Sequence, residues 1–476
     1  MGEEESDDIK PRENCGIFGI YSEKPNVSER IYDGMTKLAH RGHESYGIAT
    51  FSEPERRLIF NRKMGHVFSG FTRGEFEQLD GHFGGGHIRY STRGTSDILH
   101  AQPFWFKSDR FGEFALMHNG TIRNAEELRK NYGMKKFIST SDTEVAGKLI
   151  CSGKDLVEGI KLASKEMLGS YSFLIIGKDG LYAVRDPWGI KPLCIGNING
   201  DIAISSESCA FDTNKNLVRD IDRGEIYHYG RDGKWSESIG KKQKALDIFE
   251  LIYFAWPKSI IDGIPVDCFR IEVGRRLARR DKEMLKNRDD LLVVGVELSG
   301  NSYADGYAYE SRLRKLPYIM RLRTDRSFIQ PSQEKREDIV KKKIDIMESS
   351  IKKYLKKIVL VEDSLVRGIT AQTSLINPLR EAGIKEIHFR IGFLPVINTC
   401  PFGIDMKKPE DHFAIQHPPD KWAEVLGVDS LMYSRLEDLI GAANDVCLNG
   451  EKLSVHDFCT RCVTGRDPQE KEMARV

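Results

Sequence analysis

The chain has 476 residues, enough for two or three domains with their own cores, and its 72 Lys and Arg against 71 Asp and Glu leave a formal net charge of +1. This balance excludes nucleic-acid or membrane binding by bulk electrostatics, and no apolar run is long enough to span a bilayer. The acidic N-terminus and the nine scattered cysteines argue against secretion and a disulfide framework, so we expect a cytoplasmic protein.

The first distinctive stretch is residues 12–20, where Cys15 is followed by Gly16 and an alternating apolar run. This pattern predicts a buried strand with Cys15 at its mouth. If residues 1–14 were removed, Cys15 would carry a free α-amino group, whose pKa of about 7.7–8.0 suits a general base for its own thiol. A small buried cysteine without chemistry is the alternative that this stretch alone leaves open.

Up to about residue 235 the chain is rich in short β-like runs and Gly-containing turns, at residues 47–52, 86–91, 114–118, 170–177 and 202–206. Two helical patterns interrupt them, residues 27–39 and residues 142–152. The second pattern is preceded by Ser141, with Glu144 as the expected capping-box partner. Such a mixture predicts two sheets packed face to face with helices outside.

Polar clusters lie at residues 40–45, 84–94, 117–122 and 141–144. Taken alone, Asn119-Gly120 is an ordinary turn signal, and residues 141–144 are an ordinary helix cap. Their order behind a Cys-Gly pair near the N-terminus favours a functional site instead.

Residues 15–19, 40–42, 86–92, 118–120 and 141–144 closely resemble the class II glutamine amidotransferases, and residues 185–209 continue the match. That family's glutaminase domain has the N-terminal-nucleophile fold, an α+β αββα sandwich. The resemblance implies a propeptide at residues 1–14 and a glutaminase domain at residues 15–240, ending in the polar stretch 229–244. The site residues that it implies are the nucleophile Cys15, the oxyanion donors Asn119 and Gly120, and the glutamine-binding residues Arg89, Thr92 and Asp142.

Residues 241–445 alternate strand-like and helix-like patterns, with apolar runs at 291–296 and 358–361 and helices expected at 270–286 and 371–382. Continuous apolar runs bounded by charge are typical of parallel strands buried on both faces. We therefore expect an α/β doubly wound domain with ligands at the carboxyl ends of its strands.

The strongest motif of this half is residues 358–370, where an apolar strand is followed by Glu362, Asp363 and a loop into a helix N-terminus. Loop N–H groups favour a phosphate, and the carboxylates suit ribose hydroxyls or Mg²⁺. Two surface charges are the alternative. The motif resembles the signature of type I phosphoribosyltransferases. The resemblance implies a phosphoribosyl pyrophosphate site of Glu362, Asp363, Ser364, Arg367, Gly368 and Thr370, with Mg²⁺ at Ser299, Glu362 and Asp363.

Together the two halves resemble the glutamine phosphoribosylpyrophosphate amidotransferases, which begin purine biosynthesis. The resemblance implies glutamine hydrolysis at Cys15 and attack of the ammonia on C1 of phosphoribosyl pyrophosphate. It also implies a homodimer or tetramer inhibited by purine nucleotides.

Two departures from the family pattern leave alternatives open. Residues 369–371 keep one hydroxyl where relatives have three, and residues 320–327 replace the loop that closes over the substrate. A glutaminase with a diverged sugar-phosphate site is one alternative. A non-catalytic, nucleotide-binding regulator is the other, and the retained glutaminase residues argue against it.

Three cysteines match positions that bind a 4Fe–4S cluster in many relatives, namely Cys400, Cys459 and Cys462. Asp247 stands where relatives have the fourth cysteine, and a carboxylate can replace a thiolate as an iron ligand. The C-terminal segment, residues 446–476, would thus carry cluster ligands. Three unligated thiols are the alternative.

Overall fold

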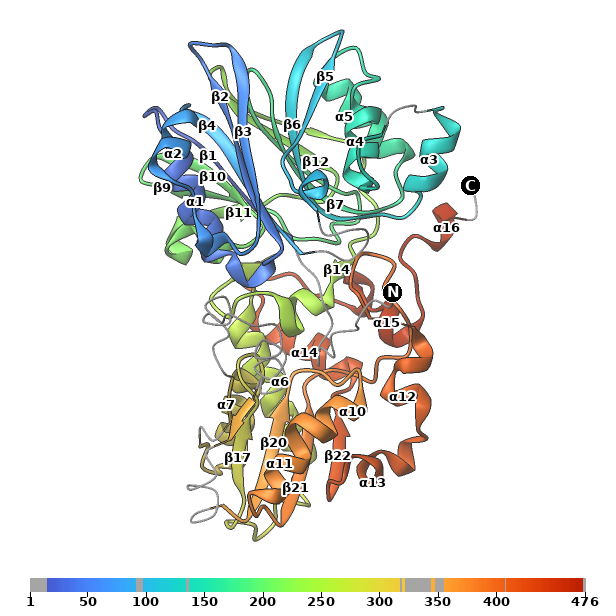
Figure 1. Ribbon diagram of the computed structural model, residues 1–476. Helices are drawn as coiled ribbons and strands as arrows, with labels where there is room; N and C mark the ends of the chain where they lie inside the picture. Colours follow the sequence, from blue (N-terminus) through green and yellow to red (C-terminus); the bar gives the residue numbers. More distant parts are fainter. Residues whose placement is uncertain are drawn as a thin grey trace, which may run out of the picture.

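The computed structural model describes residues 15–90, 97–133, 137–316, 319–321, 344–346, 355–406 and 408–473, with the backbone alone for 319–321, 344–346 and 369–370. Figure 1 shows two bodies along one long axis, a pair of sheets built from the first half of the chain and a smaller sheet built from the second half. None of the helices in these residues is both long and apolar enough to cross a membrane.

In the described part of the first half, antiparallel strands form a seven-stranded sheet in the order β11-β9-β10-β1-β4-β2-β3. Their bounds are β1 (Gly16–Tyr21), β2 (Ser45–Ser52), β3 (Arg57–Met64), β4 (Phe83–Arg89), β9 (Cys194–Ile198), β10 (Asp201–Ser205) and β11 (Leu217–Asp220). The described residues also form a six-stranded sheet in the order β13-β12-β8-β7-β6-β5. Its strands are β5 (Phe104–Ser108), β6 (Gly112–Ile122), β7 (Gly169–Ile176), β8 (Gly180–Arg185), β12 (Glu225–Gly230) and β13 (Gly233–Ser238).

The two sheets pack face to face through apolar side chains such as Ile17 of β1, Met117 of β6 and Leu174 of β7. Helices cover the outer faces: α1 (Ser28–Lys37) and α2 (Arg73–Gln78) on one side, and α3 (Ala125–Asn131), α4 (Asp142–Ile150) and α5 (Leu156–Glu166) on the other. The predicted αββα sandwich is confirmed. Each layer needs the other because a sheet or an amphipathic helix must bury its apolar face.

Two local signals in this half differ from the structure, and the predicted capping box is wrong. Asn119-Gly120 is not a turn, because both residues lie within β6 and pair with β7. Ser141 caps α4 by accepting from Thr143 N at 3.2 Å, but the carboxylate of Glu144 accepts from Ile138 N and Ser139 N instead of closing a capping box.

In the described residues of the second half, parallel strands form a four-stranded sheet in the order β17-β20-β21-β22. The strands are β17 (Leu292–Gly295), β20 (Lys357–Glu362), β21 (Glu386–Ile391) and β22 (Ser430–Tyr433). The helices are α6 (Val266–Arg280), α7 (Gly300–Ser311), α10 (Gly368–Ala371), α11 (Asn377–Glu381), α12 (Phe413–Gln416), α13 (Trp422–Leu426), α14 (Leu436–Val446), α15 (Arg461–Thr464) and α16 (Glu470–Met473).

Residues of β20 alternate between two cores. Val359 and Val361 pack with α6 and α7 on one face, and Ile358 and Leu360 pack on the opposite face. The expected doubly wound sheet, buried on both faces, is therefore confirmed. The helix expected at 371–382 is interrupted by a π-helical turn, Gln372–Ile376, between α10 and α11.

Short strand pairs within the second half are formed by β14 (Leu246–Asp247) with β23 (Phe458–Cys459), β15 (Ile260–Ile261) with β16 (Ile264–Pro265), and β18 (Ile319–Arg321) with β19 (Ile344–Ile346).

The two halves are joined by more than the connecting chain. The C-terminal segment returns to the first half, where Gln469 donates to Gly169 O at 2.7 Å and Arg123 pairs with Asp467 at 2.9 Å. The polar stretch in which the first domain was expected to end, 229–244, contains β13, and the domain limits of 15–240 and 241–445 stay predictions.

Candidate active sites

Cys15 lies half-buried directly before β1, at the end of the strand. Gly16 pairs with Ile88 of the neighbouring strand β4, so continuing this register by one residue brings Cys15 opposite Arg89, the last residue of β4. The carbonyl oxygen of Cys15 accepts a hydrogen bond of 3.0 Å from Arg41 Nε. The predicted nucleophile and the predicted carboxylate-binding residue therefore lie together at one end of the sandwich.

The predicted oxyanion donors come from the other sheet. Asn119 is buried in β6, and its Nδ2 has no hydrogen-bond partner among the described residues. Gly120 has φ = +140°, and a Cβ there would lie 2.2 Å from Ser170 O, so only glycine fits. A buried amide donor without a partner costs stability unless a ligand engages it.

A buried histidine links the strand that carries Arg89 to the strand that carries Asn119. His87 of β4 contacts His118 O of β6 through Nε2 at 3.0 Å, one residue before Asn119. Burial lowers the pKa of His87 to about 3, so the ring is neutral, and because a carbonyl only accepts, Nε2 carries the proton. This bond holds the Arg89 strand against the Asn119 strand.

The predicted glutamine-binding groups have other partners in this structure. Arg89 Nη1 pairs with Glu44 Oε1 at 2.9 Å, an interaction that the sequence did not predict. Asp142, the first residue of α4, accepts from Ile122 N at 2.8 Å. Thr92 lies outside the described residues.

In the second half, Glu362 ends β20 and Asp363 follows it, fully buried. The carboxylate of Asp363 accepts hydrogen bonds from the hydroxyls of Ser299 and Ser364. The loop from β17 approaches closely, because a Cβ at Gly300 would lie 2.7 Å from Val361 O. The predicted ligands of Mg²⁺, Ser299, Glu362 and Asp363, are thus brought together at the carboxyl end of the sheet.

Other predicted residues of this site lie in the following loop. Arg367 is half-buried, and Gly368 begins α10. The side chain of Thr370 and residues 322–343, which include most of the expected closing loop, lie outside the described part of the chain.

The predicted cluster ligands lie near one another where the two halves meet, since Cys400 packs against one apolar cluster with Cys459 and Trp188 and against another with Cys462. Asp247 pairs with Cys459 across the β14–β23 ladder, and Phe402 N donates to Cys400 Sγ at 3.4 Å. Burial and the nearby Asp247 carboxylate raise the pKa of Cys400 to about 12. A buried lysine, Lys191, donates to Asp247 Oδ2 at 2.9 Å, which the sequence did not predict.

The spacing of these side chains bears on which metal they could hold. Among the described residues, His40, Glu207 and Cys209 have ligand atoms that all lie within 4.8 Å of one another. The predicted cluster ligands do not form so compact a group. A single tetrahedral ion with metal–sulfur bonds of about 2.3 Å would need closer thiols. The donors, three thiols and one carboxylate, fit a larger group such as an iron–sulfur cluster better than one ion.

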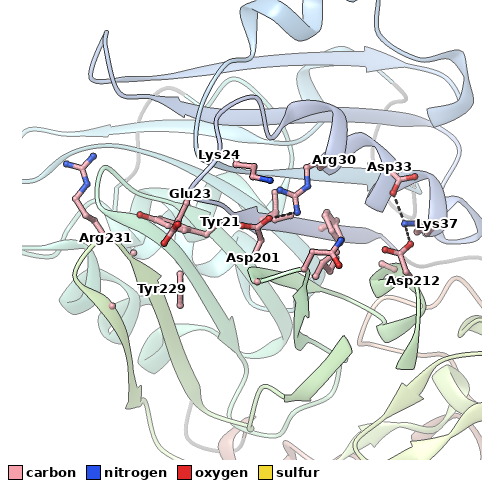
Figure 2. Close-up of a pocket in the computed structure, with 18 residues that line it drawn as sticks. Tyr21, Glu23, Lys24, Arg30, Asp33, Lys37, Asp201, Asp212, Tyr229 and Arg231 are labelled. Atoms are coloured by element: carbon pink, nitrogen blue, oxygen red, sulfur yellow. Dashed lines mark hydrogen bonds and ion pairs between the residues drawn. The ribbon is translucent and has the colours of Figure 1, made fainter. Parts of the chain in front are cut away.

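One further cavity lies away from the predicted sites. A cavity of about 940 Å³ lies beside α1 and the β9–β10 turn, and none of the predicted site residues lines it. Figure 2 shows that many of its charges are already paired, Arg30 with Asp201 at 2.7 Å and Lys37 with Asp33 at 2.6 Å.

Comparisons with known proteins agree with this geometry. Residues 87–213 match the glutamine amidotransferase domain family. The amidophosphoribosyltransferase of Methanocaldococcus jannaschii is 38% identical over 97% of this chain and 99% of its own, and that of Bacillus subtilis is 35% identical over 96% and 94%.

Solved structures give the same result over the whole fold. The B. subtilis glutamine phosphoribosylpyrophosphate amidotransferase, complexed with ADP and GMP, superposes with a TM-score of 0.83 at 31% identity, covering 95% of this chain and 97% of that chain. A structure described as the allosteric regulatory enzyme of purine biosynthesis superposes with a TM-score of 0.84 at 31% identity, covering 95% and 96%.

Proposed function

The chain belongs to the amidophosphoribosyltransferase family, and we propose that it divides the family's reaction between a glutaminase centre at Cys15 and a synthetic centre at Asp363. It is a glutamine-dependent enzyme of purine biosynthesis that transfers ammonia to C1 of phosphoribosyl pyrophosphate. The products are 5-phosphoribosylamine, glutamate and pyrophosphate. The observation that carries the division is the buried Asn119 Nδ2, unpartnered among the described residues, beside the positive-φ Gly120.

In the glutaminase centre, the Cys15 thiol attacks the side-chain carbonyl of glutamine, and the α-amino group exposed by loss of residues 1–14 takes the thiol proton. Asn119 Nδ2 and Gly120 N–H donate to the oxyanion of the tetrahedral intermediate. Its collapse breaks the C–N bond and releases ammonia, which takes the proton back from the α-ammonium group, and water then hydrolyses the Cys15 thioester to glutamate and free thiol. Arg89 binds the α-carboxylate of glutamine, and Asp142 binds its α-amino group. The salt bridge of 2.9 Å between Arg89 and Glu44 supports this role, since the guanidinium donates to a carboxylate at this position.

In the synthetic centre, the loop that follows β20 holds phosphoribosyl pyrophosphate. Glu362 and Asp363 face the ribose hydroxyls, while Ser364, Arg367, Gly368 and Thr370 surround the 5′-phosphate. Mg²⁺ held at Ser299, Glu362 and Asp363 would neutralise the departing pyrophosphate. The hydroxyl–carboxylate contact between Ser299 and Asp363 supports this site, because both groups offer the oxygen ligands that Mg²⁺ prefers.

We also propose a 4Fe–4S cluster held by Cys400, Cys459, Cys462 and Asp247. It is supported by the N–H···S bond to Cys400 and the pairing of Asp247 with Cys459. Inhibition by purine nucleotides is proposed because the B. subtilis relative is complexed with ADP and GMP. A homo-oligomer, dimer or tetramer, and a cytoplasmic location stay predictions.

Intact mass and activity measured on one anaerobic preparation test the proposal. We expect a chain that begins at Cys15 and releases both glutamate and pyrophosphate when glutamine, phosphoribosyl pyrophosphate and Mg²⁺ are supplied. Cys15→Ser should abolish glutamate release and spare synthesis from ammonium, whereas Asp363→Asn should abolish synthesis from either nitrogen source. Glutamate release by Cys15→Ser at the wild-type rate would refute the glutaminase assignment.

A further inference from the structure

A buried arginine, Arg41, lies directly behind the proposed nucleophile. Its side chain is fully buried, in the 3₁₀ turn Ala39–Arg41 that follows α1. Arg41 Nε donates to Cys15 O at 3.0 Å, and Nη1 donates to Glu207. The guanidinium therefore contacts the backbone of the residue that carries both the thiol and the proposed α-amino base.

The same guanidinium is held by a residue from the other half of the chain. Glu250 is fully buried in the π-helical turn Glu250–Phe254, and its two carboxylate oxygens accept from Arg41 Nη1 and Nη2, each at 3.1 Å. Such a two-point contact fixes the plane of the guanidinium as well as its position. Glu250 thus determines where Arg41 Nε points.

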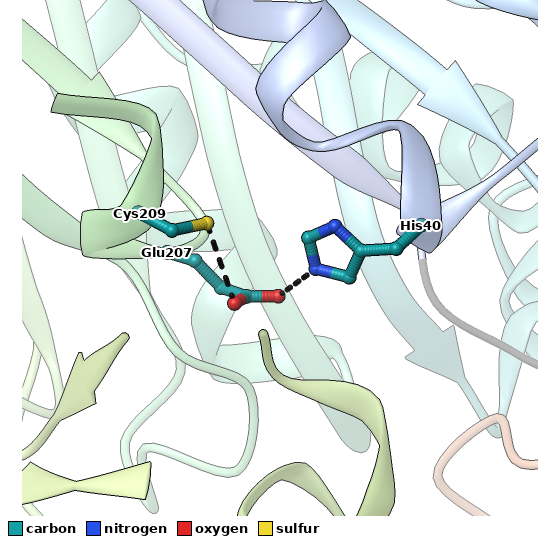
Figure 3. A group of neighbouring side chains, drawn as sticks. All are labelled: His40, Glu207 and Cys209. Atoms are coloured by element: carbon teal, nitrogen blue, oxygen red, sulfur yellow. Dashed lines mark hydrogen bonds and ion pairs between the residues drawn. The ribbon is translucent and has the colours of Figure 1, made fainter. Parts of the chain in front are cut away.

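The second half also holds Glu207, the other carboxylate that contacts Arg41. Glu207 Oε2 accepts from Trp256 N at 2.8 Å and from Ser259 Oγ at 2.6 Å, and Oε1 contacts His40 Nε2 at 2.8 Å. Figure 3 shows Glu207 between His40 and Cys209, whose ligand atoms could suggest a metal site. The Arg41 cation beside Glu207 and the full use of both carboxylate oxygens argue against a metal ion there.

Neighbouring charges extend the arrangement toward the proposed cluster. Lys191 Nζ lies 3.8 Å from Glu250 Oε1 and 2.9 Å from Asp247 Oδ2. Removing one partner from a buried ion pair leaves an uncompensated charge, so each member strongly constrains the next. Because the Arg41 side chain contacts both Glu250 and Cys15, a displacement of the turn that carries Glu250 would shift Cys15.

We propose that Arg41 is a positioning residue for the Cys15 nucleophile, and that Glu250, across the boundary between the two halves, holds Arg41 in place. The inference rests on the proposed role of Cys15. Fixing the Cys15 carbonyl fixes its Cα, from which both the thiol and the α-amino group extend. Misplacement of a reacting group by about 1 Å can cost about 100-fold in rate, so a loosened Arg41 acts on kcat.

Two variants test the proposal, Arg41→Lys and Glu250→Gln, with Glu272→Gln as the matched control. Lysine keeps the charge but cannot span Cys15 O, Glu207 and Glu250 together. Glu272 is also a buried glutamate of the second half paired with arginines, at 2.8 Å from Arg275 and 3.2 Å from Arg279. Each variant is compared for glutamate release, for synthesis from ammonium, for thermal unfolding and for the pH dependence of Cys15 alkylation by iodoacetamide.

We expect glutamine-dependent kcat to fall by about 10- to 100-fold in Arg41→Lys and by about 10-fold in Glu250→Gln, with KM for glutamine changed by less than about three-fold. In Glu250→Gln the less neutralised guanidinium should lower the α-amino and thiol pKa values of Cys15, moving its alkylation profile to lower pH. Synthesis from ammonium should stay at the wild-type level in Arg41→Lys and Glu250→Gln. In Glu272→Gln, glutamate release, synthesis from ammonium and the alkylation profile should all stay at the wild-type level, although its unfolding temperature falls because a buried ion pair is lost there as well.

Wild-type glutamate release with an unmoved alkylation profile in folded Arg41→Lys and Glu250→Gln would overturn the proposal. Equal loss of both activities together with a large fall in unfolding temperature would also overturn it, because Arg41 would then be merely structural. Cys15→Ser in the same series distinguishes failure of this proposal from failure of the proposed function, since glutamate release by that variant would overturn the proposed function itself.

Discussion

Replacing Asn119 by alanine isolates the side-chain half of the proposed oxyanion site. Asn119 is 1% exposed in β6, and its Nδ2 donates to nothing among the described residues. Its removal therefore breaks no bond of the unliganded protein that involves this donor. An effect on glutamine hydrolysis then reports the transition state rather than the folded ground state.

The expected magnitude follows from that position. A preorganised oxyanion donor contributes about 2.7–4 kcal/mol, which corresponds to a fall of about 10²–10³ in kcat. KM for glutamine should change little, because Arg89 and Asp142 bind the two ends of the amino acid. The free energy of unfolding should fall by only about 1 kcal/mol, since the lost amide nitrogen gives up no hydrogen bond.

Glutamate release and ammonium-dependent pyrophosphate release are measured side by side, with thermal unfolding as the control for folding. Asn119→Asp is a second variant, of the same shape but with an acceptor in place of the donor, and it should be at least as slow. A kcat within about three-fold of wild type in Asn119→Ala would refute the oxyanion role. A matching loss in ammonium-dependent synthesis would show that the substitution acts on the whole fold.

Three further predictions rest on other contacts. Gly120→Ala should lower stability by about 2–4 kcal/mol and abolish glutamate release, because the new Cβ would lie 2.2 Å from Ser170 O at φ = +140°; chemical denaturation measures the first effect. Burial lowers the pKa of His87 to about 3, below its usual 6.5, so the unfolded chain binds the extra proton between these values. The free energy of unfolding should therefore fall as pH drops below about 6.5, by up to about 1.4 kcal/mol per pH unit. In His87→Gln the unfolding temperature should depend less steeply on pH over this range than in the wild type. Asp247→Cys should slow the loss of iron to a chelator, because a thiolate binds iron more firmly than a carboxylate already paired with Lys191 at 2.9 Å; an unchanged rate would count against the cluster.

Local pattern predicted much of the fold because strands and their ends are local properties. The apolar run of β20 followed by two acids placed Asp363 at the carboxyl end of a buried strand, and the structure agrees. Where a local signal competed with strand pairing, it lost. Asn119-Gly120 reads as a turn, yet Gly120 pairs with Tyr171 and the strand continues to Ile122.

The motifs also supplied the identities of the site residues, but not the groups that hold them. Arg89 was predicted to bind a carboxylate, and the structure pairs it with Glu44, 45 residues earlier in the chain. Asp247 was predicted as a cluster ligand, and the structure adds Lys191, 56 residues away. Glu44 lies in a polar run and Lys191 is a single charge in an apolar stretch, and no spacing links either one to its partner, so the sequence offered no signal for the pairings.

The sequence by itself determined the two chemistries of this protein, because a nucleophile beside glycine and a carboxylate pair after a strand are set by neighbouring residues. The tertiary structure alone decided how the two halves meet. Arg41 and Glu250 are 209 residues apart, and neither lies in a repeating pattern. Their contact exists because the packing of one half on the other buries both charges, and a buried charge is stable only beside its opposite.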